Sequence, residues 1–215
     1  MATSEQQQFE VYSLTEDEHD AFSEAFNLGI GVAASSLSEM IDAEIQLSVP
    51  RIEAMRKIDA AAAADMEHSL SIRGVRERFS GPFSGSALLL FPQNRSLELV
   101  RLLLQQPDAD IAFVTEMEQE ALSEVGNIIL NACLSTMASI MGDEIHNEIP
   151  EPVVGELKDV IIGNQDIGDD DYVLRLRVEF AVKHINLNGY IAFLMDIESL
   201  DIFRRKLAEY FGFAQ

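Results

Sequence analysis

The sequence predicts an α+β fold in which one structural unit is built twice. A glutamate, an asparagine three residues later and a proline 23 residues beyond it occur in two copies that lie 100 positions apart: Glu24, Asn27 and Pro50, then Glu124, Asn127 and Pro150. Each copy lies in an apolar pattern of helical period and is followed by segments of strand character. We therefore expect a pseudo-two-fold duplicated domain, with long motif helices packed on an antiparallel sheet of hairpins.

The domain boundaries follow from this repeat. Residues 1–13 carry little periodic signal and are expected to form a lead-in segment, and residues 14–215 form one domain made of two pseudo-repeats, 14–108 and 109–215. A chain of 215 residues can bury a full-sized core without cross-links. The single cysteine, Cys133, excludes an internal disulfide framework and a Cys-rich zinc site, and it favours a reducing, intracellular setting.

Charge and composition narrow the classes of partner. The net charge of −22 opposes binding to nucleic acid or to anionic membrane surfaces and favours a partner with a basic patch. The polar, acidic start has no signal-peptide pattern, and no apolar run approaches the roughly 20 residues that span a bilayer. We expect a cytoplasmic protein, and the acidity is also compatible with a salty cytoplasm.

The first long helix is expected to begin at Thr15. Thr15 and Glu18 have the spacing of a capping box, which satisfies free backbone N–H groups. Apolar residues then recur every three or four positions over residues 22–41 and form one core-facing stripe. Gly29 and Gly31 within it indicate close packing against a neighbour rather than a helix end.

The remaining elements repeat in order. Residues 44–55 alternate as a half-buried strand, and Pro50 predicts that this strand lies at an edge or bends. A short helix, two hairpin strands and a helix follow at 60–64, 69–79, 85–91 and 96–104. The second half is expected to contain a capping box at Thr115 and Glu118, a helix ending near Gly142, a short strand at 144–150, hairpin strands at 172–183 and 189–195 joined by residues 185–188, and a helix at 199–207.

Polar residues share one face of each motif helix. They fall at positions i, i+4 and i+7, which a helix brings to one side: Asp20, Glu24 and Asn27, then Glu120, Glu124 and Asn127. A solvated surface or a purely structural hydrogen bond is the ordinary role of such residues. Because asparagine lowers helix propensity, its retention beside a glutamate in both copies favours a functional role.

The doubled pattern acid-x3-Glu-x2-Asn-x22-Pro resembles the CheC/CheX/FliY family of chemotaxis phosphatases, in its two-motif, free-standing form, over nearly the whole chain. The resemblance implies hydrolysis of the aspartyl-phosphate of a phosphorylated, CheY-like response regulator. It assigns catalysis to Glu24 with Asn27 and to Glu124 with Asn127, where asparagine orients the attacking water and glutamate docks the regulator. Asp20, Glu120 and the two prolines, Pro50 and Pro150, would be supporting residues.

The resemblance also implies which cofactors and partners to expect. The protein would carry no cofactor or metal of its own, and Mg²⁺ would be supplied by the phosphorylated partner. A CheD-like deamidase is a further expected partner. The first motif departs from the family pattern, since Phe26 stands where glycine is usual, whereas the second copy keeps Gly126. If Phe26 hindered the approach of a partner, the second site would be the better one.

Other functions stay open on the sequence alone. A non-catalytic scaffold of the same fold could dock a receiver domain or a CheD-like partner, and residues 144–152 could form an edge for self-association. Four scattered histidines and the acidic turn Gly168–Asp171 lack the spacing of metal sites.

Overall fold

The computed structural model describes residues 14–66, 71–103, 111–163, 168, 171–182 and 185–213. The expected lead-in segment, 1–13, lies outside them. The helices are α1 (Glu16–Ile41), α2 (Lys57–Met66), α3 (Gln93–Leu103), α4 (Ile111–Met141), α5 (Leu157–Ile162) and α6 (Ile197–Phe211). The strands are β1 (Ile45–Arg56), β2 (Ser71–Ser80), β3 (Gly85–Pro92), β4 (His146–Asn147), β5 (Glu151–Glu156), β6 (Tyr172–Val182) and β7 (Ile185–Met195).

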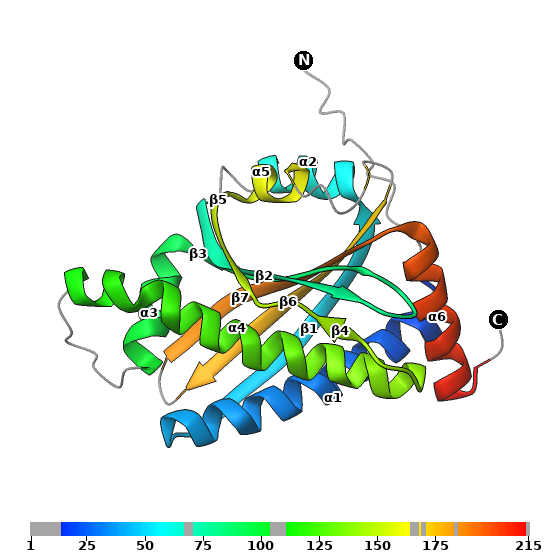
Figure 1. Ribbon diagram of the computed structural model, residues 1–215, viewed down its shortest axis with the longest axis horizontal. Coiled ribbons are helices and arrows are strands. Elements are labelled where there is room, and N and C mark those ends of the chain that lie inside the picture. Colours follow the sequence, from blue (N-terminus) through cyan, green and yellow to red (C-terminus); the bar gives the residue numbers. More distant parts are fainter. Residues whose placement is uncertain are drawn as a thin grey trace, which may run out of the picture.

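The described strands form one seven-stranded sheet in the order β1-β6-β7-β3-β2-β4, with β5 also paired to β2 (Figure 1). The pairings are antiparallel, and the hairpins β2–β3 and β6–β7 meet at the centre. β1 pairs with the later hairpin, while β4 and β5 pair with the earlier one. The expected α+β class is confirmed. The repeat boundary at 108 and 109 stays a prediction, because residues 104–110 are outside the described part.

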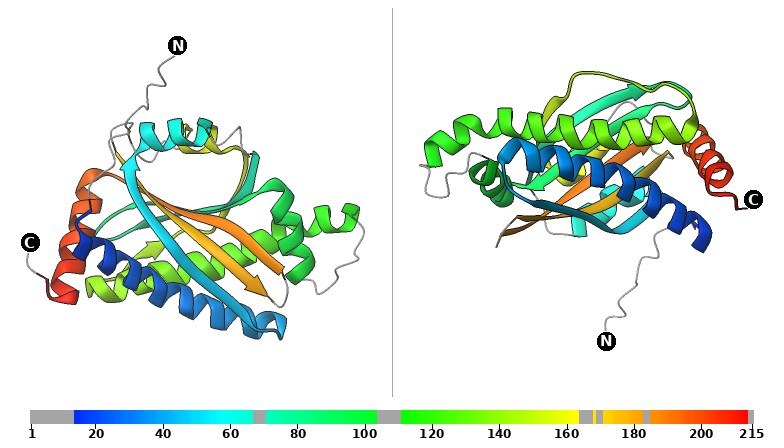
Figure 2. Two further views of the ribbon diagram at one scale, coloured as in Figure 1. Left: turned by 180° about the vertical axis from the view of Figure 1, so that it is seen from behind. Right: turned by 90° about the horizontal axis from the view of Figure 1, so that it is seen from below.

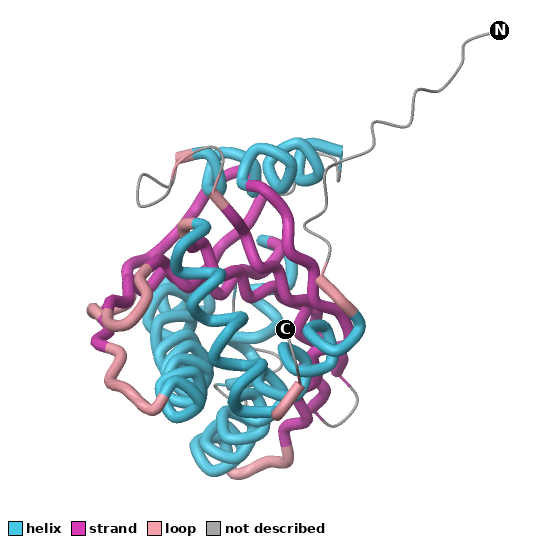
Figure 3. Tube along the Cα trace, turned by 90° about the vertical axis from the view of Figure 1, so that its right-hand side faces the viewer, coloured by secondary structure: helices cyan, strands magenta, loops and turns pink. Residues whose placement is uncertain are grey.

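Helices cover both faces of the sheet, as the side view in Figure 3 shows. Successive residues of β3 point to opposite faces and enter different cores. Ala87, Leu89 and Phe91 join the larger core beneath α1 and α4. Leu88 and Leu90 join a smaller core that includes residues of α2 and α5. The middle of the sheet is therefore buried on both sides, and the motif helices have a rigid support.

The two motif helices lie side by side on one face of the sheet and run in opposite directions (Figure 2). They approach closely at Gly29, where an added Cβ would stand 3.0 Å from the Cα of Cys133. The expected close packing is thus confirmed for Gly29, whereas Gly31 faces open space. Cys133 is buried, and burial raises the pKa of its thiol to about 12. Both motifs precede this crossing in their helices, so the two sites lie toward opposite ends of the pair.

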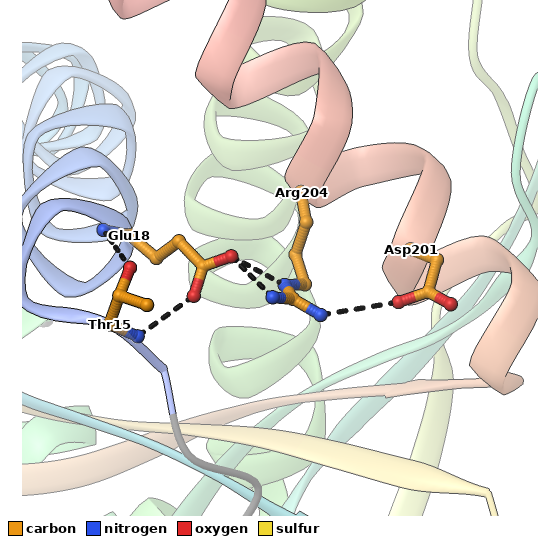
Figure 4. Close-up of polar contacts among 4 residues, drawn as sticks. All are labelled: Thr15, Glu18, Asp201 and Arg204. Carbon is orange, nitrogen blue, oxygen red and sulfur yellow. Dashed lines mark hydrogen bonds and ion pairs between the residues drawn. The ribbon is translucent and has the colours of Figure 1, made fainter. Parts of the chain in front are cut away.

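The start of α1 is fixed by the expected capping box. The Thr15 N–H donates to Glu18 Oε2 over 2.8 Å, and the Glu18 N–H donates to Thr15 Oγ1 over 3.3 Å. The other oxygen of Glu18 accepts from the Arg204 guanidinium of α6, whose Nη1 also contacts Asp201 (Figure 4). The cap therefore also joins α1 to α6 beside the first motif.

The second capping box was predicted wrongly. Thr115 lies inside α4, which begins four residues earlier at Ile111. The apolar residues at 111–114 extend the helix toward its N-terminus. Glu118 is buried instead, pairing with Arg73 Nη1 at 3.0 Å and accepting from the Ser96 hydroxyl. It connects α4 to β2 and α3 rather than capping a helix.

Other boundaries also shifted. The expected strand at 144–150 reduces to β4, while β5 and α5 were not foreseen. β5 contains Pro152 and Gly155, which lower strand propensity, yet an outer strand tolerates proline because it needs fewer ladder donors. β7 starts at Ile185, so the residues expected to form the turn at 185–188 pair with β6. Residues 183 and 184, between β6 and β7, lie outside the described part.

In the part of the chain that the structure describes, one helix has the length and apolar composition of a membrane span, contrary to the expectation that no apolar run approaches this length. The portion Met117–Met141 of α4 is long and apolar enough to cross a bilayer on those criteria alone. Half of the residues in its most apolar 18-residue segment are buried inside the fold, where α4 packs on α1 and the sheet. Burial of this kind is usual for the core helix of a globular domain.

Candidate functional site

The first site consists of Asp20, Glu24 and Asn27, and the structure brings all three to the surface of α1. Each residue is exposed. They line a shallow hollow of about 570 Å³ together with Phe211, the last residue of α6, and Phe213, two residues beyond it. No pattern in the sequence pointed to these two aromatic residues, because their approach depends on how α6 packs across α1.

The second site consists of Glu120, Glu124 and Asn127 on α4, and all three are exposed. The Asn127 amide is held from its own helix, since Asn131 Nδ2 donates to Asn127 Oδ1 over 2.7 Å. Among the described residues, no side-chain hydrogen bond of this kind holds Asn27. The two sites therefore share an exposed face but differ in how firmly the asparagine is oriented.

The asparagine of the second site is the outer end of a hydrogen-bond chain that reaches into the sheet. Asn147 Nδ2, from β4, donates both to Asn131 Oδ1 and to Glu77 Oε1 of β2. Glu77 is fully buried, and burial raises the pKa of its carboxyl to about 6, partly offset by the bond from Asn147. Sequence reasoning missed this chain, because only the packing of α4 over β2 brings its members together.

Glu77 should make the stability of the fold depend on pH. Its folded pKa of about 6 exceeds the ordinary 4.5, so the folded state favours the proton. This preference for the protonated carboxyl contributes on the order of 2 kcal/mol to the stability of the fold. The contribution is fully present below pH 4.5 and is lost as the pH rises through 6. Replacing Glu77 by glutamine should leave stability near pH 4 little changed and raise it at pH 7.5. Denaturant unfolding of both proteins at the two pH values measures this, and an equal difference at both would contradict it.

Phe26 does not obstruct the first site. Its ring is 1% exposed and packs among aromatic residues of the core, with its centroid 5.2 Å from that of Phe193 and 6.3 Å from that of Phe203. The equivalent Gly126 lies directly over the sheet, where an added Cβ would stand 2.1 Å from Val75 Cγ2. The residue before each asparagine therefore points inward, and the steric reason for preferring the second site does not hold.

The prolines of the repeated motif lie in the sheet and its connections. Pro50 is within β1, an outermost strand, where the pairing with β6 shifts register between Ser48 and Arg51. This confirms the expected edge or bend. Pro150 is partly buried in the connection between β4 and β5, three residues after Asn147. It thus borders the strand that reaches the second site.

Both sites present carboxylates and an amide to solvent without a cluster suited to holding a metal. Within the described residues, no group of three or more histidine, cysteine, aspartate or glutamate side chains is placed to bind an ion. At the acidic turn, the Gly168 N–H donates to Asp171 Oδ2 over 2.6 Å. The chemistry that the exposed pairs support is positioning: an amide can orient a small polar molecule, and a carboxylate can pair with a cation on a partner.

The chain is similar in sequence to chemotaxis phosphatases, although no protein-family model matches it. It is 26% identical to the CheY-P phosphatase CheC of Bacillus subtilis over 143 residues, which is 64% of this chain and 66% of that protein. It is 21% identical to the putative CheY-P phosphatase CheC1 of Halobacterium salinarum over 171 residues, or 80% and 86% of the two chains.

The solved structures agree in fold. The crystal structure of FliY from Thermotoga maritima superposes with a TM-score of 0.71 at 17% identity, covering 93% of this chain and 98% of the chain in that structure. The CheX–CheY–BeF3–Mg²⁺ complex of Borrelia burgdorferi gives 0.50 at 18% identity, over 80% and 97%. The sequence relatives carry the names CheC and FliY, and the fold is the one seen in FliY and CheX. In sequence and in fold, the chain is therefore similar to proteins of the CheC/CheX/FliY family.

Proposed function

We propose that this protein hydrolyses the aspartyl-phosphate of a CheY-like response regulator. The observation that carries the proposal is the exposure of both Glu-x-x-Asn pairs on helices that are packed firmly on the sheet: Glu24, Asn27, Glu124 and Asn127 all face solvent. Asparagines buried and saturated by their own backbone could not reach a partner. Exposed ones on a stiff helix can enter another protein's active site.

The residues suit this chemistry. An acyl phosphate has a good leaving group, so its hydrolysis mainly needs an aligned water and neutralised phosphoryl oxygens. An asparagine amide can donate to one group and accept a hydrogen from the water, without a charge that would repel the phosphoryl group. The glutamate one helical turn earlier would pair with a cation of the regulator, for which a lysine is proposed, and fix the docking register.

The relatives support a CheY-like partner. CheC of Bacillus subtilis is named a CheY-P phosphatase, and the Borrelia burgdorferi complex holds CheX with CheY, BeF3 and Mg²⁺. We propose that Mg²⁺ reaches this protein's sites with the regulator. The hollow at the first site, with Phe211 and Phe213 at its rim, would receive apolar surface of the partner. A CheD-like deamidase stays a proposed second partner.

The test is direct. The purified protein is mixed with a phosphorylated receiver domain from the same cell in Mg²⁺, and loss of phosphate is timed against spontaneous decay. Acceleration at substoichiometric protein supports catalysis. Binding of the regulator without any acceleration would replace the proposal with the scaffold function.

A further inference from the structure

The hydrogen-bond chain of Glu77, Asn147, Asn131 and Asn127 has a direction. An ionised carboxylate only accepts hydrogen bonds, so the Asn147 atom that faces Glu77 must be its NH2 group. That NH2 also contacts Asn131, which therefore presents its oxygen, and the Asn131 NH2 is left to donate to Asn127 Oδ1. The charge of Glu77 thus determines which end of the exposed Asn127 amide faces outward.

The stability of the fold does not explain why a glutamate occupies the buried position 77. Glu77 is fully buried, and in the described part of the structure its second oxygen, Oε2, has no hydrogen-bond partner. A buried carboxylate of this kind costs free energy, and an apolar residue would serve packing better. The other carboxylate oxygen of Glu77, Oε1, accepts a hydrogen bond from Asn147 Nδ2.

The charged groups around Glu77 are engaged elsewhere. Its neighbours on β2, Arg76 and Arg78, alternate to the other face and pair with Glu151 at 2.9 and 3.2 Å. His146 of β4 and Glu148 of the following connection are exposed. Neither β3 nor the part of α4 beyond Glu124 contains a charged residue. Arg73, on the same face of β2 as Glu77, pairs with Glu118 of α4 at 3.0 Å. The neighbouring arginines of β2 are thus paired with other carboxylates, while Asn147 donates to Glu77.

The residues of this hydrogen-bond chain occur at the second copy of the motif only. One hundred positions away from Asn131, Asn147 and Glu77 stand Gly31, Leu47 and Arg177. Gly31 has open space around it, and Arg177 lies at the surface, 3.5 Å from Glu179. Since the duplicated architecture persists without these residues at the first site, the fold does not require them.

We propose that Glu77 is a positioning residue of the second site, which acts through Asn147 and Asn131 to hold the Asn127 amide in one orientation. The proposal rests on the phosphatase function proposed above. With one lone pair of Asn127 Oδ1 held by Asn131, the other lone pair and both N–H groups face the partner. The second site should therefore contribute more turnover than the first.

The sharpest variant is Asn131→Asp. Aspartate has nearly the shape of asparagine but only accepts, so it still receives the Asn147 NH2 while forcing Asn127 to turn its own NH2 inward. In a protein that also carries Asn27→Ala, this change should lower turnover of the phosphorylated receiver domain at least about tenfold, and more than Asn131→Ala does. Ser135→Asp adds the same charge one turn along the exposed face and should change turnover less than about twofold.

A second measurement does not depend on activity. In ¹⁵N-labelled protein, the side-chain NH2 signals of Asn127, Asn131 and Asn147 should shift together as pH passes through the titration of Glu77, and Glu77→Gln should remove that shift. If the signals shift together but the parent protein has no phosphatase activity, the hydrogen-bond chain is supported and the phosphatase function is refuted. Signals that titrate independently, or full turnover in Asn131→Asp, would overturn the positioning role.

Discussion

Replacing Asn27 and Asn127 together by alanine should reduce stimulated dephosphorylation of a phosphorylated receiver domain at least about a hundredfold. The proposed contribution of the protein is the alignment of water, and removing a group that acts chiefly in the transition state has losses of that order. Both side chains are exposed, so the fold should tolerate their truncation. Timed loss of phosphate, with the regulator in excess, measures the effect.

The single variants and a control complete this experiment. Asn127→Ala should cost more than Asn27→Ala, because only Asn127 is oriented by a neighbouring amide among the described residues. Replacement of Ser135, an exposed serine on α4, by alanine serves as the control and should leave turnover and far-ultraviolet circular dichroism unchanged. A double variant that keeps the parent rate would remove asparagine from the mechanism.

Gly126→Ala should destabilise the fold by about 3 kcal/mol, the largest loss of stability expected from adding a single methyl group at either motif. The new Cβ would stand 2.1 Å from Val75 Cγ2, so α4 must lift from β2 or Val75 must leave its position. Replacing Val75 by alanine removes the methyl group that the new Cβ would meet. The double change Gly126→Ala with Val75→Ala should therefore be more stable than the sum of the two single effects.

The matched control is Gly31→Ala in α1. It is the same substitution inside a helix, at a position where no atom other than its chain neighbours and the helix's own backbone lies within 4 Å of the new Cβ. Alanine is favoured over glycine there by up to about 1 kcal/mol, so this variant should be slightly stabilised. Denaturant unfolding of the four variants and the parent protein tests these expectations. Equal effects of alanine at positions 126 and 31 would show that contact with Val75 does not constrain the helix.

The local elements were readable from the sequence because their signals are local. The capping box of Thr15 and Glu18, the apolar period of α1 and the turn glycine at 142 each act within a few residues, and the structure has them where they were expected. The same reasoning failed at Thr115, where the identical spacing lies inside a longer helix. A capping signal does not show whether the preceding residues continue the helix.

Residue spacing was enough to establish the doubled motif, the α+β class and the exposed face that carries the two Glu-x-x-Asn pairs, because periodicity along one helix decides which side chains lie together. Three-dimensional packing was needed to show that Phe26 is core, that Phe211 and Phe213 border the first site, and that Glu77 reaches Asn127 through two amides. These contacts join segments that are distant in the chain. Which segments meet depends on how the strands pair and the helices cross, and no local pattern records that.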